Sequence, residues 1–255
     1  MKNNRSRFLG RLKRFLLKCL LPIAFWIGLW QLCAVCIGNK FLFASVPDTL
    51  SALKDLFISD SFLLSVGLSL LRVVAGLSLG ICFGIIIAIL CHSSSLLSAI
   101  ILPFIKIIKS TPVASFIVVL WVMMSGDALA IFIAILMVMP IICQNLLDGY
   151  ASIDVHLSEV AKIFGFSRLK TFRVLIFPTL KSYLIPAIIT ASGLAWKAEI
   201  AAEIIAYTKR SIGQGINDAK YDMDTARVFA WTVVVVTLSI ILEKCTKYLL
   251  RRFAK

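Results

Sequence analysis

Long apolar runs separated by short polar stretches make up most of the 255-residue chain. A helix needs about 20 predominantly apolar residues to cross roughly 30 Å of hydrocarbon. Six runs approach or exceed this length, at about residues 15–37, 64–91, 96–124, 128–147, 180–206 and 226–246. The pattern therefore predicts an all-α membrane protein with six transmembrane helices.

The polar segments between these runs predict little regular structure. Residues 38–61 are predicted to form a loop that holds a short helix near 48–58, and residues 207–225 are predicted to form a polar loop. The third run, 96–124, is predicted as one span, although Pro103 and Pro112 interrupt it.

Three glycines recur at every fourth position of the second run, at Gly76, Gly80 and Gly84. Small residues at this spacing lie on one face of a helix and let a neighbouring helix approach closely in a membrane. This glycine row predicts a tightly packed helix pair.

Asp154 to Pro178 is the one long internal segment that mixes charge with apolar residues. Four apolar residues fall at i, i+3, i+4 and i+7, which places them along one stripe of a helix. They are Leu157, Val160, Ala161 and Phe164. Such a helix can dock on a partner protein or lie on the membrane surface, and the stripe alone leaves both interpretations open.

Residues at the boundaries of this segment predict a pair of short helices. Asp154 can cap the first helix, and Gly165 can adopt the left-handed conformation that ends it. Ser167 can cap a second helix, which Pro178 is predicted to close.

Basic residues concentrate on one predicted side of the membrane. Residues 1–18 hold seven Lys and Arg, and residues 154–181 and 244–255 hold five each. The opposite loops, 38–61, 125–127 and 208–225, hold five in total beside seven acids. Cytoplasmic segments carry an excess of Lys and Arg, so both termini and the 154–178 segment are predicted to be cytoplasmic.

The composition excludes several function classes. The chain is 60% hydrophobic and 16% charged, and its net charge of +14 lies at membrane boundaries, without the interleaved aromatic residues of a nucleic-acid surface. Cys33 and Cys36 form a CxxC within an apolar span, where packing is the favoured role. Two histidines are too few for a metal site, and no Walker A, HExxH or GxSxG motif occurs. The sequence therefore predicts a protein without enzymatic activity.

From Glu159 onward the residues resemble the EAA loop of ABC importer permeases. E-V-A-K-I-F-G, then nine residues, then L-I-F-P is similar to that loop's E-A-A, three residues, G, nine residues and I-x-L-P. Val160 stands in place of the middle alanine. The resemblance extends over about residues 60–250, with S-T-P at Ser110 to Pro112 and W-K-A-E-I-A-A-E at Trp196 to Glu203. These motifs are similar to the nitrate/sulfonate/taurine branch.

The resemblance implies a type I importer (MetI-like) permease with a cytoplasmic coupling helix between spans 4 and 5. It implies a permease core at 60–250 that contains spans 2–6. The basic residues of 1–14 predict a cytoplasmic N-terminus, and the apolar run at 15–37 predicts the first transmembrane helix. The coupling loop is residues 154–178. The residues expected to couple to an ATPase are Leu157, Glu159, Val160, Ala161, Phe164, Gly165 and Pro178.

The resemblance also implies partners and a location. ABC ATPase subunits, an extracytoplasmic solute-binding protein and a second permease subunit in a homodimer are expected, together with membrane lipid and without nucleic acid. The ATPase uses the ATP, so no cofactor is expected in this chain. The expected location is the bacterial cytoplasmic (inner) membrane, which the chain crosses several times.

Ionisable residues inside the apolar runs are candidates for a solute pathway, because burying a charge in a bilayer costs roughly 2.5–3.5 kcal/mol. The candidates are Lys106, Lys109, Thr111, Lys197, Glu199 and Glu203. Lys106 and Lys109 share one helix face, as do Glu199 and Glu203, whereas Lys197 lies about 200° from Glu199 at 100° per residue. The same charges can instead form structural ion pairs or extend to the interface, and the sequence leaves both readings open.

The lysines favour a small anion such as a sulfonate, taurine or nitrate as the solute. A neutral or cationic nutrient of the vitamin-precursor type remains an alternative. A secondary transporter is disfavoured, because the six runs show no inverted repeat.

Overall fold

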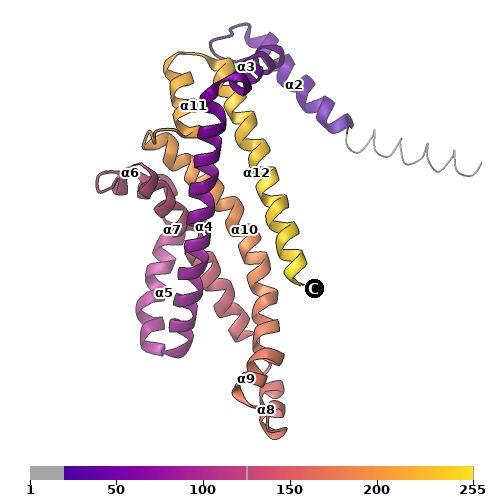
Figure 1. The fold of residues 1–255 in the computed structure, drawn as a ribbon, viewed down its shortest axis with the longest axis vertical. Helices are drawn as coiled ribbons and strands as arrows, with labels where there is room; N and C mark the ends of the chain where they lie inside the picture. The colour runs from indigo at the N-terminus through magenta and orange to yellow at the C-terminus, as the bar shows by residue number, and fades with distance from the viewer. Residues whose placement is uncertain (1–19, 125, 255) are drawn as a thin grey trace, which may run out of the picture. The chain divides into compact units, whose positions relative to one another are not determined.

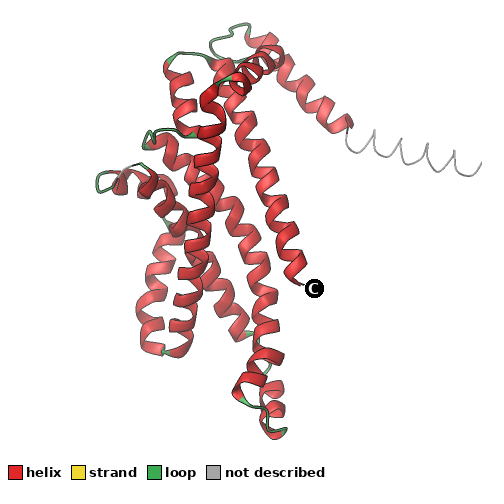
Figure 2. Cartoon of the chain, viewed as in Figure 1, coloured by secondary structure: helices red, strands yellow, loops and turns green. Residues whose placement is uncertain are grey.

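The computed structural model describes residues 20–124 and 126–254, and every regular element within them is helical (Figure 2). The described residues form two compact units. One unit contains the chain up to Ser59 together with Asp218–Val233, and the other contains Asp60–Asn217 together with the chain from Val234 onward. The all-α prediction is therefore confirmed for the described chain.

Within the described residues, four helical segments are long and apolar enough to cross a membrane. They are α4 (Asp60–Ser93), α7 (Asp127–Ala151), Arg168–Ile205, which includes α10 (Phe177–Ile205), and α12 (Thr225–Ala254) over Thr225–Arg252. The bent pair α5 (Ser95–Ser110) and α6 (Val113–Trp121) makes a fifth if it counts as one span. The predicted first span begins outside the described residues, and its described part is α2 (Leu21–Ile37).

The run at 96–124, predicted as one span interrupted by prolines, is not one continuous helix, because the chain bends by 101° between α5 and α6. Thr111, directly before Pro112, has an extended backbone with ψ 132°. A residue before proline is driven out of the helical region, and proline offers no N–H to continue the helix. The Thr111 N–H and hydroxyl both donate to the Ile107 carbonyl, at 3.0 and 2.8 Å, and this closes α5.

The prediction of a loop at 207–225 is wrong, because residues Ile212–Tyr221 form helix α11. Two glycines in its sequence disfavour a helix locally. Its first N–H groups are instead satisfied by side chains from outside the helix: Ile212 N donates to Ser69 Oγ and Gly213 N donates to the Glu203 carboxylate. Tertiary hydrogen bonds thus outweigh local propensity here.

The short helix predicted near 48–58 is confirmed as α3 (Val46–Ile58). Ser45 caps its start, since its hydroxyl oxygen accepts a hydrogen bond from the Asp48 N–H at 3.3 Å. Pro47 lies in the first turn, where a missing N–H costs little.

The glycine row of α4 packs directly on α7, as predicted. A Cβ placed on Gly76, Gly80 or Gly84 would lie 2.5, 2.6 or 2.7 Å from the Cβ of Ala134, Val138 or Ile142, respectively. Such separations are impossible without moving a helix. The other side of α7 packs on α10 and α6, through buried residues that include Leu129, Ala130, Ile133, Ala198, Ala202 and Ile117.

We predict that Gly80→Leu destabilises the protein by about 1–3 kcal/mol or more, because overpacking would force α4 away from α7. The measurement is the thermal unfolding midpoint of the detergent-purified protein. Gly67→Leu is the matched control, since Gly67 lies on the same helix and a Cβ there meets nothing within 4 Å. Equal midpoints for the two variants would contradict close α4–α7 packing.

Candidate functional site

The predicted coupling loop, residues 154–178, begins with helix α8, Val155–Ile163. Asp154 precedes it with an extended backbone, and its Oδ1 accepts a hydrogen bond from the His156 N–H at 2.8 Å. The predicted cap at Asp154 is confirmed.

Gly165 ends this helix in the left-handed conformation, with φ +66°. Its N–H donates to the Lys162 carbonyl at 3.0 Å, and the next N–H, of Phe166, donates to the Ala161 carbonyl at 2.9 Å. This pair of bonds satisfies two carbonyls at the helix end and reverses the chain within two residues. The predicted role of Gly165 in the turn is confirmed.

A second short helix, α9 (Arg168–Thr171), follows with Ser167 as its cap, as predicted. The prediction that Pro178 closes this helix is wrong. The chain continues through a π-helical turn, Phe172–Ile176, directly into α10, so that Pro178 lies in the first turn of α10. Pro178 has no N–H to donate, and the Phe177 N–H before it donates to the Phe172 carbonyl, five residues back, in the wider π-helical turn. Figure 1 shows α8 and α9 beside the first turns of α10.

Most of the predicted apolar stripe of α8 is exposed. Leu157, Val160 and Phe164 are 52%, 44% and 74% exposed, and Glu159 is also exposed. Ala161 is buried. The stripe prediction missed Val155 and Ile163, which add to the exposed apolar surface and fall outside a strict i, i+3, i+4, i+7 pattern. Apolar side chains gathered on a short exposed helix can pack against another protein.

A polar cluster, buried at its centre and exposed at Asp127, lies at the other end of α10. We call it the Glu203 network. It consists of the side chains of Ser69, Arg72, Asp127 and Glu203 and the backbone polar groups of Lys209, Ile212 and Gly213.

Arg72 and Glu203 form the central ion pair of this network, with 2.6 Å between Arg72 Nη1 and Glu203 Oε1. Their side chains are 3% and 0% exposed. The Ser69 hydroxyl donates to both Glu203 oxygens at 2.7 and 2.8 Å, and the Gly213 N–H donates to Oε2 at 3.1 Å. These bonds satisfy a buried carboxylate that would otherwise be costly.

Arg72 uses its other N–H groups to join two further segments. Its Nη2 lies 2.8 Å from Asp127 Oδ1 at the start of α7, and the same nitrogen donates to the Lys209 carbonyl at 3.3 Å. One guanidinium thus connects α4, α7, α10 and the turn before α11.

The pathway candidates fall into two groups. Lys106, Lys109 and Lys197 are exposed in this chain and Thr111 is half-buried, whereas Glu199 and Glu203 are fully buried. Glu203 forms a structural ion pair, which was the alternative to a pathway role. Neither oxygen of Glu199 accepts a hydrogen bond from any residue that the structure describes.

Sequence reasoning missed Ser69, Arg72 and Asp127. Arg72 had a readable signal, because it is the one Lys or Arg in the 34-residue helix α4, and a charge inside an apolar span needs a partner. Its partner could not be named, since Glu203 lies 131 residues away in the sequence.

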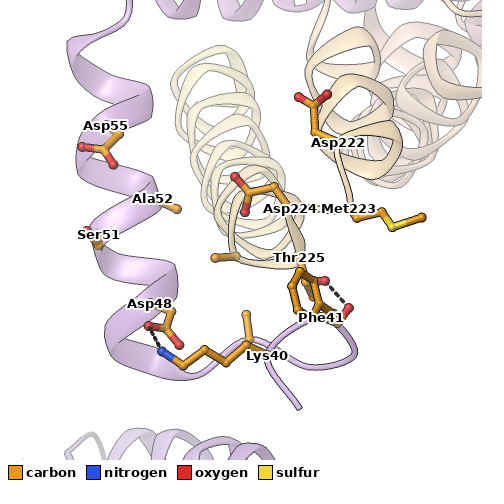
Figure 3. Close-up of a pocket in the computed structure, with 12 residues that line it drawn as sticks. Lys40, Phe41, Asp48, Ser51, Ala52, Asp55, Asp222, Met223, Asp224 and Thr225 are labelled. Carbon is orange, nitrogen blue, oxygen red and sulfur yellow. Dashed lines mark hydrogen bonds and ion pairs between the residues drawn. The ribbon is translucent and has the colours of Figure 1, made fainter.

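A separate cavity of about 520 Å³ lies within the unit that contains α3 (Figure 3). Four aspartates line it, at positions 48, 55, 222 and 224. Lys40 Nζ lies 3.3 Å from Asp48 Oδ1. The hydroxyl of Ser45 and the ammonium of Lys40 hold the pKa of Asp48 below its usual value. Within residues 20–124 and 126–254, no group of three or more His, Cys, Asp or Glu is arranged to hold a metal ion.

The family model for "Binding-protein-dependent transport system inner membrane component" matches residues 80–255, more than half of the chain. The chain belongs to this family. Members are multi-pass inner-membrane permeases of ABC transporters that work with an ATPase and a binding protein, and they are not themselves enzymes. The resemblance and the predicted lack of enzymatic activity are therefore confirmed.

Three relatives of this permease are named for small anionic or sulfonated solutes. The putative aliphatic sulfonates permease of Bacillus subtilis is 24% identical over 96% of this chain and 90% of its own length. The taurine permease of Escherichia coli is 25% identical over 72% of this chain and 67% of its own length. The nitrate import permease of Leptolyngbya laminosa is 26% identical over 78% and 76%.

Solved transporter structures share the fold of this permease. The MetNI methionine ABC transporter in inward-facing conformations matches with a TM-score of 0.63 at 15% identity, over 78% of this chain and 100% of that one. An amino acid ABC transporter matches with a TM-score of 0.62 at 16% identity, over 79% of this chain and 94% of that one. The MetI-type fold predicted for the permease core is confirmed at this level.

We predict that Arg72→Met destabilises this permease by about 3–5 kcal/mol, because Glu203 would remain buried without its cation. The measurement is the thermal unfolding midpoint in detergent. Adding Glu203→Gln should recover part of the loss, since the amide carries no charge. Lys197→Met, which removes an exposed cation of α10, is the control. An Arg72→Met midpoint equal to that of the control would show that the ion pair contributes nothing.

Proposed function

We propose that the chain is the permease subunit of an ABC importer that forms the translocation pathway for a small anion, such as a sulfonate, taurine or nitrate. Family membership supports transport, and the exposed apolar surface of α8 is the observation that carries the coupling mechanism. Because Gly165 reverses the chain and α9 leads through the π-helical turn into α10, a force on α8 reaches a membrane-spanning helix directly.

The coupling loop is the proposed docking site for the ATPase. Exposed Leu157, Val160 and Phe164 supply the apolar centre of the contact. Lys162 and Arg168 can pair with acidic residues of the ATPase at the edge of that contact. ATP is bound and hydrolysed by the ATPase subunits, so this chain contributes no cofactor site. Closure of two ATPases would draw two such loops together and move the attached helices.

The proposed topology has six spans, with both termini and the coupling loop in the cytoplasm. The distribution of Lys and Arg supports this orientation. The sixth span is the predicted helix at 15–37, of which α2 is the described part. The proposed complex contains two copies of this permease, two ATPases inside and a solute-binding protein outside.

The exposed lysines within the apolar segments are the proposed pathway cations. Lys106 and Lys109 project from α5, and Lys197 projects from α10, without an ion pair within the described residues. A charged side chain in a membrane segment requires water or a counter-ion. Facing a water-filled pathway between two permease copies satisfies this requirement and favours an anionic solute.

Gly165→Arg tests the coupling proposal. A non-glycine residue in the left-handed conformation costs about 1–2 kcal/mol, which is roughly tenfold in an equilibrium, and the long side chain would also stand against the docked ATPase. We expect the variant to insert in the membrane but to lose ATPase copurification and stimulated ATP hydrolysis.

Gly165→Asn is the matched control, because asparagine tolerates the left-handed conformation better than other residues. It should retain most of the copurified ATPase. Wild-type stimulation of hydrolysis in Gly165→Arg would refute docking at this loop.

Lys109→Ala and Lys197→Ala test the pathway proposal. Each should reduce anion import several-fold in proteoliposomes while leaving the amount of assembled complex unchanged, because the solute loses an attractive charge in a low-dielectric path. The solute is first identified by binding measurements on the extracytoplasmic binding protein with sulfonates, taurine and nitrate. Lys54→Ala in α3 is the control, and unimpaired import in both test variants would overturn the assignment.

A further inference from the structure

The turn that joins α10 to α11, residues 206–211, has an unusual backbone. Tyr207 and Arg210 adopt the left-handed conformation, with φ 53° and 51°. This conformation is unfavourable for residues with a side chain and persists only where the surrounding structure enforces it. Two such residues within four positions therefore need strong support.

Hydrogen bonds within the turn provide part of this support. The Thr208 N–H donates to the Glu203 carbonyl at 3.0 Å, and the Ser211 hydroxyl donates to the Thr208 carbonyl at 2.6 Å. The Arg210 N–H donates to Gln214 Oε1 at 2.6 Å. Thr208 and Ser211 are each 1% exposed, so the inner side of the turn is packed.

The Glu203 network provides the rest of the support. Arg72 holds the Lys209 carbonyl, Ser69 accepts from the Ile212 N–H, and Glu203 accepts from the Gly213 N–H. A Cβ on Gly213 would lie 2.4 Å from the Glu203 Cβ, so only glycine allows this approach. The backbone on both sides of Arg210 is thus fixed to α4 and α10.

The outer side of the same turn is cationic and aromatic. Lys209 and Arg210 are exposed, and Tyr207 is 40% exposed. Within residues 20–124 and 126–254, neither cation takes part in an ion pair. Tyrosine and arginine on a rigid surface are typical of the residues that dominate protein interfaces.

We propose that the outer side of this turn is a contact for the extracytoplasmic binding protein, on an acidic part of that protein's surface. Ser69, Arg72 and Glu203 are positioning residues that act through the turn. The proposal rests on the proposed topology, in which this turn is extracytoplasmic. The 29 residues of α10 separate it from the coupling loop, by about 43 Å at 1.5 Å per residue.

The rigidity of the turn favours a protein over lipid headgroups as its partner. Cations that contact lipid do so through flexible side chains and need no fixed backbone. A preorganised surface, in contrast, lowers the entropy lost when two proteins dock. Anionic lipid is nevertheless an outcome that the experiment distinguishes.

The test uses the permease–ATPase complex in nanodiscs of neutral lipid, with the extracytoplasmic binding protein loaded with the solute that the binding measurements identify. ATP hydrolysis is measured against binding-protein concentration. Lys209→Glu with Arg210→Glu should raise the half-maximal concentration roughly tenfold or more, because two attractions become repulsions. Higher ionic strength should weaken the wild type but not this variant.

Lys54→Glu with Lys220→Glu is the charge-matched control, and its half-maximal concentration should stay within about twofold of the wild type. Equal curves for the turn and control variants would overturn the proposal. An effect of the turn variant that appears only in nanodiscs with anionic lipid would also overturn it, in favour of a lipid contact. A wild-type complex that no binding protein stimulates would instead refute the proposed function itself.

A second pair of variants tests the positioning role. Arg72→Gln should raise the half-maximal concentration, since the Lys209 carbonyl and Glu203 lose their donor. Arg72→Lys, which keeps the charge, should give a half-maximal concentration between those of Arg72→Gln and the wild type. If Arg72 has a purely structural role, Arg72→Gln should give less assembled complex with an unchanged half-maximal concentration. That result would remove Arg72 and Glu203 from the proposal. The Lys209→Glu, Arg210→Glu variant would still test whether the turn contacts the binding protein.

Discussion

The ion pair between Arg72 and Glu203 is the constraint on which the architecture of the larger unit depends. Two charges withdrawn from water are tolerated only when every remaining donor and acceptor is satisfied. Ser69, Asp127 and the backbone of the turn before α11 meet this demand. The same demand requires glycine at position 213 and gives α11 its first hydrogen bonds, so a helix with little propensity of its own forms beside the pair.

The glycine row of α4 supplies a second, purely steric constraint. Lipid gives apolar helices little reason to associate, so close contact and polar bonds must hold them together. Gly76, Gly80 and Gly84 bring α4 against α7 along more than two turns, and Arg72 lies one turn before the row and bonds to Asp127 at the start of α7. Contact and charge therefore fix the same pair of helices, and α10 joins it through Glu203.

Local sequence signals predicted those features that local physics decides. Apolar runs gave the candidate spans, and Asp154, Gly165 and Ser167 marked helix ends by their own hydrogen bonds or backbone preferences. Features that depend on residues far away in the sequence were not predicted. The helix α11 depends on Ser69 and Glu203, and the role of Arg72 depends on a residue 131 positions away. Pro112 gave a signal for the bend, but the length of the apolar run outweighed it.

The π-helical turn at Phe172–Ile176 connects the predicted coupling loop to the helices that these constraints hold together. The Phe177 N–H donates to the Phe172 carbonyl, five residues back, and this wider turn lets the chain pass Pro178 without breaking the helical path from Arg168 to Ile205. The far end of that path is held by the Glu203 network, and its middle packs on α7. Packed interiors resist continuous deformation. A displacement of α8 by the proposed ATPase docking can therefore be accommodated in two ways. It can be absorbed at the π-helical turn, or it can move α4, α7 and α10 as one body. The buried ion pair and the glycine contacts both oppose sliding between these three helices, so a displacement that passes the π-helical turn moves them together.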